Sequence, residues 1–137
     1  MTSRIRVRGP TLAAAFAEAA LAALARSIDP RSVEEREVRE VRAHGDSVEA
    51  LLVNWINECL YVHEVEAFAW RRVEFAVFDV EPRAGAEPMR VHSFLHGESV
   101  FLEGNPVGAA IDVDAASISL RTEEGGYEIA LDSSPTA

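Results

Sequence analysis

The sequence predicts an α+β fold in which two helices pack on a largely antiparallel or mixed β-sheet. Two segments carry apolar residues at helical spacing, several others alternate as strands do, and glycine- and proline-containing turns separate the later strands. The expected order is β-α-β-α-β-β-β-β, because the strand pairs at the end of the chain are predicted hairpins. With 137 residues the chain is long enough for one domain, 1–137, with a substantial core.

The chain is expected to begin with a strand and a helix. Residues 4–8 alternate arginine with aliphatic residues that would face the core. Thr11 can cap the helix, which we expect to run to about Ser27. The alanine-rich run 12–25 could also belong to a signal peptide, but Glu18 interrupts it. Its bulkier apolar residues repeat every four positions, which favours an amphipathic helix.

A second helix is expected over residues 47–64, with Asp46 or Ser47 as its cap. Glu49 follows Asp46 at the spacing of a capping box. The apolar residues recur at helical spacing and form one face: Val48, Leu51, Leu52, Trp55, Cys59 and Val62. This face is expected to pack on the sheet.

The remaining segments are expected to be strands and loops. We expect an exposed or edge strand within 32–44, a strand covered on both faces at 70–80, its antiparallel partner at 89–96, and a final hairpin of 111–120 with 127–131. The loops would lie at 82–88 and 97–108, and residues 133–137 would form a frayed tail.

Composition excludes several classes of function. The net charge of −10 repels phosphate backbones, so direct nucleic-acid binding is not expected, whereas a cation or a basic protein partner would suit the surface. All 13 basic residues are arginine, which excludes Schiff-base chemistry and a P-loop lysine. The one cysteine, Cys59, lies on the apolar helix face and is expected to be a buried thiol, as suits a reducing cytoplasm. No run reaches membrane-spanning length.

Histidines are weak candidates for a metal site. His92 and His96 share one strand face, with Glu98 beyond them, but four residues along a strand span about 13 Å. His63 lies near the end of the second predicted helix, where we expect it to be exposed to solvent. No serine lies in a nucleophile elbow, and the sequence offers no catalytic constellation.

Carboxylates are the better metal candidates. Asp112 and Asp114 share a strand face, and Asp132 ends the last predicted strand. Carboxylates at strand ends suit Ca²⁺ or Mg²⁺, although on spacing alone a solvated acidic face explains them better. If these three residues converged around a metal, the protein could instead be a small hydrolase.

Three segments together resemble the archease family of accessory proteins. The first is Ile5-Arg-Val-Arg-Gly9-Pro-Thr11-Leu12, similar to the family's first strand and Gly-x-Thr-Leu turn. The second is Leu51-Leu52-Val53-Asn54-Trp55-Ile56-Asn57-Glu58, close to its Leu-Leu-x-x-Trp-Leu-Asn-Glu helix. The third is Gly97-Glu98 after a strand, with Asp132 near the end of the last strand.

The resemblance implies a role. Archease-like proteins bind a GTP-dependent RNA ligase that joins 3′-phosphate or 2′,3′-cyclic-phosphate ends to 5′-hydroxyl ends, and they speed its guanylylation without being catalysts. Gly97 and Glu98 would then belong to the partner-binding surface, and Asp132 to a site for Ca²⁺ or another divalent cation.

The sequence also departs from the family. Members carry His-Thr-Ala-Asp before the first strand, and that aspartate shares a metal with the C-terminal aspartate. Here Met1-Thr2-Ser3-Arg4 stands at that place, and Val107-Gly108-Ala109 stands where members have Val-Lys-Ala. Two expectations follow. Either the true start lies upstream, or this is a diverged relative that binds another protein without metal.

Overall fold

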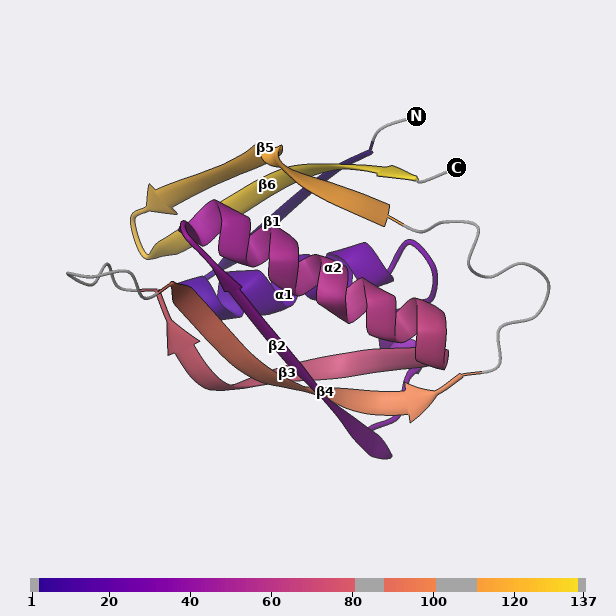
Figure 1. Cartoon of the computed structure of the whole chain (residues 1–137). Helices are drawn as coiled ribbons and strands as arrows, with labels where there is room; N and C mark the ends of the chain where they lie inside the picture. Colours follow the sequence, from indigo (N-terminus) through magenta and orange to yellow (C-terminus); the bar gives the residue numbers. More distant parts are fainter. Residues whose placement is uncertain (1–2, 81–87, 101–110, 136–137) are drawn as a thin grey trace.

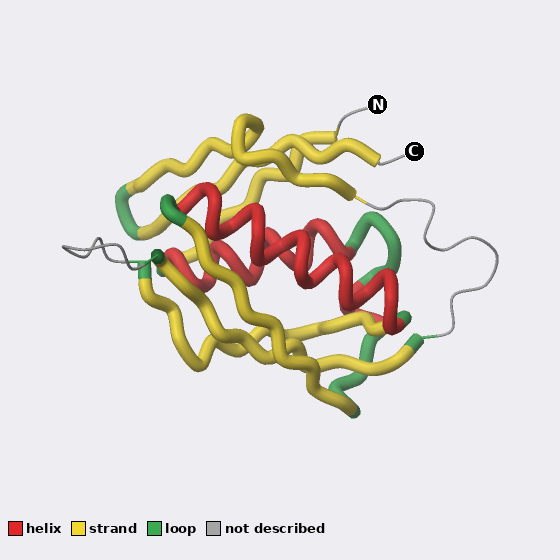
Figure 2. The backbone as a smooth tube through the Cα atoms, viewed as in Figure 1, coloured by secondary structure: helices red, strands yellow, loops and turns green. Residues whose placement is uncertain are grey.

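Two helices lie between two three-stranded antiparallel sheets (Figures 1 and 2). The computed structural model describes residues 3–80, 88–100 and 111–135, with the backbone alone at 3–4, 111–118, 123 and 131–135. The elements are β1 (Ser3–Gly9), α1 (Leu12–Leu24), the 3-10 helix η1 (Pro30–Ser32), β2 (Glu37–Gly45), α2 (Val48–Glu66), β3 (Phe68–Asp79), β4 (Met89–Ser99), β5 (Ile111–Glu123) and β6 (Gly126–Pro135). One sheet has the order β1-β6-β5 and the other β2-β4-β3.

The α+β class and the predicted element order are confirmed. The strands form two sheets, however, and both helices contact strands of each. The first and last strands of the chain pair with one another, so Ser3 to Gly9 runs antiparallel to Tyr127 to Ser133. Through this pairing, β1 belongs to the sheet formed by the end of the chain and not to the sheet formed by its middle.

The helix caps follow the sequence signals. The hydroxyl of Thr11 accepts a hydrogen bond from the Ala14 N–H at 3.1 Å, and that of Ser47 accepts one from the Ala50 N–H at 3.1 Å. Ser47, rather than Asp46, therefore caps α2. Helix α1 ends at Leu24, short of the predicted Ser27, whose N–H bonds to the Leu24 carbonyl in the turn that follows.

Strand β3 corrects one prediction. It is an edge strand, and the side chains of Arg71, Arg72 and Glu74 are exposed, so it is not covered on both faces. The register shifts between Phe75 and Val77. This irregularity places Phe75 and Phe78 toward the helices although they are three residues apart. The apolar residues on both alternations thus reflect a bulge and not a doubly buried strand.

Two further boundaries differ from the sequence prediction. Residues 97–99 continue β4 instead of opening a loop, and residues 133–135 continue β6 instead of fraying. Both are paired with neighbouring strands. The predicted turn at 82–88 and the rest of the loop lie mainly outside the described residues. The edge position predicted within 32–44 is confirmed, because β2 lies at the edge of its sheet.

The core fills the space between the sheets. Its largest fully buried side chains are Trp55, Trp70, Phe16, Phe68, Leu24, Leu51, Leu52, Ile56, Leu95, Ile129 and Val33. The predicted apolar face of α2 contributes three of them, Leu51, Leu52 and Trp55, and the helix adds Ile56. No helix in the described part of the chain is long and apolar enough to cross a membrane.

Candidate functional site

The predicted metal ligands lie at one end of the β1-β6-β5 sheet. The backbone register pairs Asp112 with Ser134, two residues along β6 from Asp132. Such diagonal positions lie roughly 7–8 Å apart. Asp114 falls in the irregular stretch between Val113 and Ile118, where no pairing is defined. The fold therefore brings the backbones of Asp112 and Asp132 into the same neighbourhood, and the prediction that they bind metal stays a prediction.

The backbone register places a basic residue opposite Asp132. Its direct cross-strand partner is Arg4, a residue with a fixed positive charge. Calcium sites gather six to eight oxygen ligands, and a guanidinium supplies none. Elsewhere among the residues whose side chains are described, no group of three or more His, Cys, Asp or Glu is arranged to hold a metal.

Gly97 allows two strands to approach closely. A Cβ at this position would overlap the Ala69 carbonyl oxygen and lie 2.6 Å from the Trp70 Cα. Gly97 also accepts a hydrogen bond on its carbonyl from the Arg36 N–H at 2.8 Å. The residue is therefore needed where β2, β3 and β4 meet.

Glu98 holds the segment that leads into β2. Its carboxylate accepts a hydrogen bond from the Glu34 backbone N–H at 2.7 Å, and its other oxygen lies 3.6 Å from Arg36 Nε. The side chain is 24% exposed, so one part of it remains accessible to solvent. Gly97 and Glu98 thus shape this corner of the protein, whatever else they bind.

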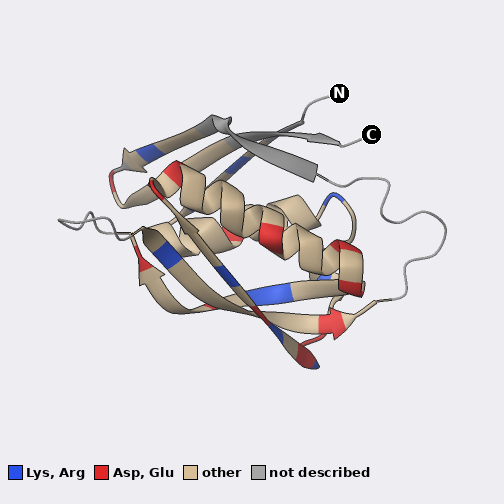
Figure 3. Cartoon of the chain, viewed as in Figure 1, with Lys and Arg blue, Asp and Glu red and all other residues tan. Residues whose placement is uncertain are grey.

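Charged residues alternate around this corner. Glu37 Oε2 accepts hydrogen bonds from the Ser99 N–H and hydroxyl, both at 3.0 Å, and these bonds lower the pKa of the Glu37 carboxyl. Arg39 donates to Glu66 at 2.8 Å, and its guanidinium lies 4.7 Å from the centre of the Phe68 ring. Figure 3 shows basic and acidic residues side by side where β2 begins and β4 ends. Gly97 itself is buried, and we call the surface formed over it by Glu34, Glu37, Val38 and Glu98 the Gly97 corner.

Two of the histidines pair with glutamates across the strands. His92 Nε2 lies 3.0 Å from Glu40 Oε2, and His96 Nε2 lies 3.0 Å from Glu74 Oε1. These partners lie on opposite sides of β4, on β2 and β3. His92 and His96 therefore do not share a ligand: each pairs with a different carboxylate.

His63 is buried, so the prediction of a solvent-exposed histidine is wrong. Only 7% of the residue is accessible. Its Nδ1 lies 2.9 Å from the Phe68 carbonyl oxygen and its Nε2 3.0 Å from the Ser27 hydroxyl. Since a carbonyl only accepts hydrogen bonds, the neutral ring carries its hydrogen on Nδ1. The ring therefore ties the end of α2 to β3 and to the segment after α1.

A buried polar chain explains part of the Trp-Ile-Asn-Glu segment. Trp55 Nε1 donates to the Ser93 hydroxyl at 2.9 Å, which in turn donates to the Val41 carbonyl at 2.8 Å. The neighbouring Asn54 side chain donates to the His44 carbonyl at 2.9 Å. Both contacts fasten α2 to the β2-β4-β3 sheet. The sequence shows the tryptophan but gives no sign that Ser93, distant in the chain, is its acceptor.

Cys59 has the predicted environment. Its side chain is fully buried, and this burial, with the nearby Glu58 charge, raises the pKa of the thiol well above its usual value. The thiol is therefore protonated and inert in the folded protein, which excludes it as a catalytic nucleophile.

Comparison with known proteins agrees with the segments identified above. The model of the archease protein family matches residues 3–129. The chain belongs to the archease family.

Curated relatives from three archaea carry the name protein archease. The chain is 35% identical to the protein of Pyrococcus abyssi over 77 residues, 56% of this chain and 54% of that protein. It is 36% identical to that of Pyrobaculum calidifontis over 94 residues, which are 69% of this chain and 60% of that protein. It is 30% identical to that of Methanosarcina mazei over 122 residues, which are 88% of this chain and 80% of that protein.

The matched segment thus spans only slightly more than half the length of the first two relatives.

Proposed function

We propose that this protein is a non-catalytic accessory partner of an RNA ligase that joins 3′-phosphate or 2′,3′-cyclic-phosphate ends to 5′-hydroxyl ends. The observation that carries the proposal is the archease family match over residues 3–129. The absence of lysine is consistent with it, because covalent guanylylation through a lysine would then occur on the partner and not on this chain.

The proposed docking surface is the Gly97 corner. It presents the partly exposed carboxylate of Glu98 beside Val38, which is 47% exposed. An aliphatic residue within a charged rim is a common composition for a protein interface. The net charge of −10 would attract a ligase that is basic where it holds RNA.

A ligase assay tests the proposal. The full chain is mixed with a ligase of this class and a divalent ion, and the rate is followed over many turnovers. A faster rate with the protein present is expected. No change at stoichiometric amounts would refute the role.

Two variants locate the surface. Glu98→Arg should abolish activation, while Glu98→Gln, which keeps an acceptor for the Glu34 N–H, should reduce it only in part. Glu74→Arg is the matched control, since it makes the same charge reversal on β3, outside the Gly97 corner, and should leave activation unchanged. Equal loss in both arginine variants would show a general charge effect instead of a local contact.

A second candidate is a family member that binds a different protein without metal. The pairing of Arg4 with Asp132 favours it, because a fixed positive charge opposes a cation at that position. Calcium titration by calorimetry separates the candidates. Tight binding that Asp132→Asn abolishes would reject the metal-free form, whereas no heat of binding would support it.

A further inference from the structure

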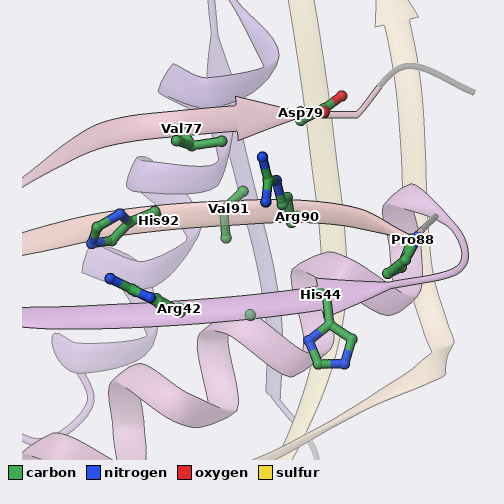
Figure 4. A pocket seen from close by; sticks show the side chains of 9 residues that line it. Arg42, His44, Val77, Asp79, Pro88, Arg90, Val91 and His92 are labelled. Carbon is green, nitrogen blue, oxygen red and sulfur yellow. The ribbon is translucent and has the colours of Figure 1, made fainter. Parts of the chain in front are cut away.

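The outer face of the β2-β4-β3 sheet carries a pocket that the archease role does not require. Its volume is about 940 Å³, and it is lined by nine residues that Figure 4 shows as sticks. Small-molecule sites commonly enclose about 300–1,000 Å³. The pocket therefore has room for a ligand of nucleotide size.

Two rows of cross-strand partners, with the row of Ala43, Val91 and Phe78 between them, form its floor. One row runs Arg42, His92, Val77 across β2, β4 and β3, and the other runs His44, Arg90, Asp79. In Figure 4 the two arginines and two histidines come from neighbouring strands. The lining thus holds two arginines and two histidines against one carboxylate, in a chain where acidic residues outnumber arginines by 23 to 13. A second carboxylate, that of Glu40, contacts Arg42 at 3.1 Å and His92 at 3.0 Å, so the excess of basic groups in the pocket is small and local.

His92 Nε2 lies 3.0 Å from Glu40 Oε2, whereas several donors of the other basic groups are available. Among the described residues, neither the Arg90 guanidinium nor the His44 ring has a hydrogen-bond or ion-pair partner. Arg42 uses Nε for Glu40, at 3.1 Å, so its remaining N–H groups are not engaged by that contact. Arginine on two neighbouring strands offers the planar donor pairs that match phosphate oxygens.

We infer that this pocket binds a small phosphate monoester of nucleoside-monophosphate size. The two arginines would bind the phosphate, and the apolar walls formed by Val77 and Pro88 would face the rest of the molecule. A long phosphate backbone is a worse fit, because the net charge of −10 repels a polyanion outside the pocket. A single phosphate group meets only the local positive charge.

Calorimetry with the full chain tests the assignment, using GMP, AMP and inorganic phosphate as separate ligands. We expect saturable binding of the nucleotides with one site, and weaker binding of inorganic phosphate, which lacks the apolar part. Arg90→Gln and Arg42→Gln should each weaken binding roughly tenfold, the effect of losing one charge-assisted contact. Asp79→Asn should strengthen it, because the one carboxylate of the lining is removed.

Arg72→Gln is the matched control. Arg72 is an exposed arginine of the same sheet, bound to Glu35 at 3.0 Å and outside the pocket lining, so its loss should leave affinity unchanged. The inference is overturned if no monophosphate binds at millimolar concentration, or if binding is equally weakened in Arg72→Gln. It is also overturned if a short RNA binds through Arg42 and Arg90 while the monophosphates do not. None of these outcomes depends on the ligase assay.

Discussion

Replacing Ser93 by alanine should destabilise the protein far more than the loss of one hydroxyl suggests. Ser93 is fully buried and stands between the Trp55 indole and the Val41 carbonyl, with hydrogen bonds of 2.9 and 2.8 Å. Alanine would leave the indole N–H buried without an acceptor, which costs about 1–3 kcal/mol. The lost bond to Val41 adds about 1 kcal/mol. The free energy of unfolding should therefore fall by roughly 2–4 kcal/mol, a large part of a typical total of about 5–15 kcal/mol.

Urea unfolding measures this loss. Because both tryptophans are buried, their fluorescence reports unfolding. In a two-state transition it should give the same midpoint as far-UV circular dichroism. A double-mutant cycle with Trp55→Phe isolates the indole–hydroxyl bond. In the Trp55→Phe background the serine substitution should cost at least about 1 kcal/mol less, because no indole N–H is left unsatisfied. A cost below about 0.5 kcal/mol in the wild-type background, or an equal cost in both, would refute the reasoning.

Three further predictions concern other parts of the fold. Gly97→Ala should lower the free energy of unfolding by about 1–3 kcal/mol or more in the same urea assay, because its Cβ would overlap the Ala69 carbonyl; an unchanged midpoint would contradict the close approach. The lowered pKa of Glu37 means that its bonds to Ser99 contribute stability above the unfolded value near 4.5 and lose it as pH falls through the lower folded value. Glu37→Gln should flatten the acid side of the stability profile, and an unchanged slope would exclude this contribution. Cys59 should react with a thiol reagent only after denaturant is added, because its thiol is buried and protonated; rapid labelling of the native protein would oppose this.

Local signals in the sequence were reliable for the helices and the first strand. Thr11 and the repeat of apolar residues located α1 and α2, since caps and helical spacing depend on neighbours a few residues away. The strand at 70–80 was identified, but its environment was not. Its bulge depends on the register with β4, and no local pattern encodes that register.

The candidate site shows the same division. The sequence supplied Gly97 and Glu98 by resemblance, and the structure gave each a physical role at a junction of three strands. His63 was misjudged because its partners, Ser27 and Phe68, lie on other elements. Position near a helix end does not tell whether another segment covers the ring.

The sequence by itself determined the α+β class, the helix that carries the Trp-Ile-Asn-Glu segment, the burial of the one thiol and the archease resemblance. Each depends on residue identity and short-range spacing. Only the tertiary structure decided that the strands divide into two sheets around the helices, that the backbones of Arg4 and Asp132 pair across two strands, and that Arg42 and Arg90 share one pocket. These facts depend on which distant segments pair, and pairing is settled by packing of the whole chain.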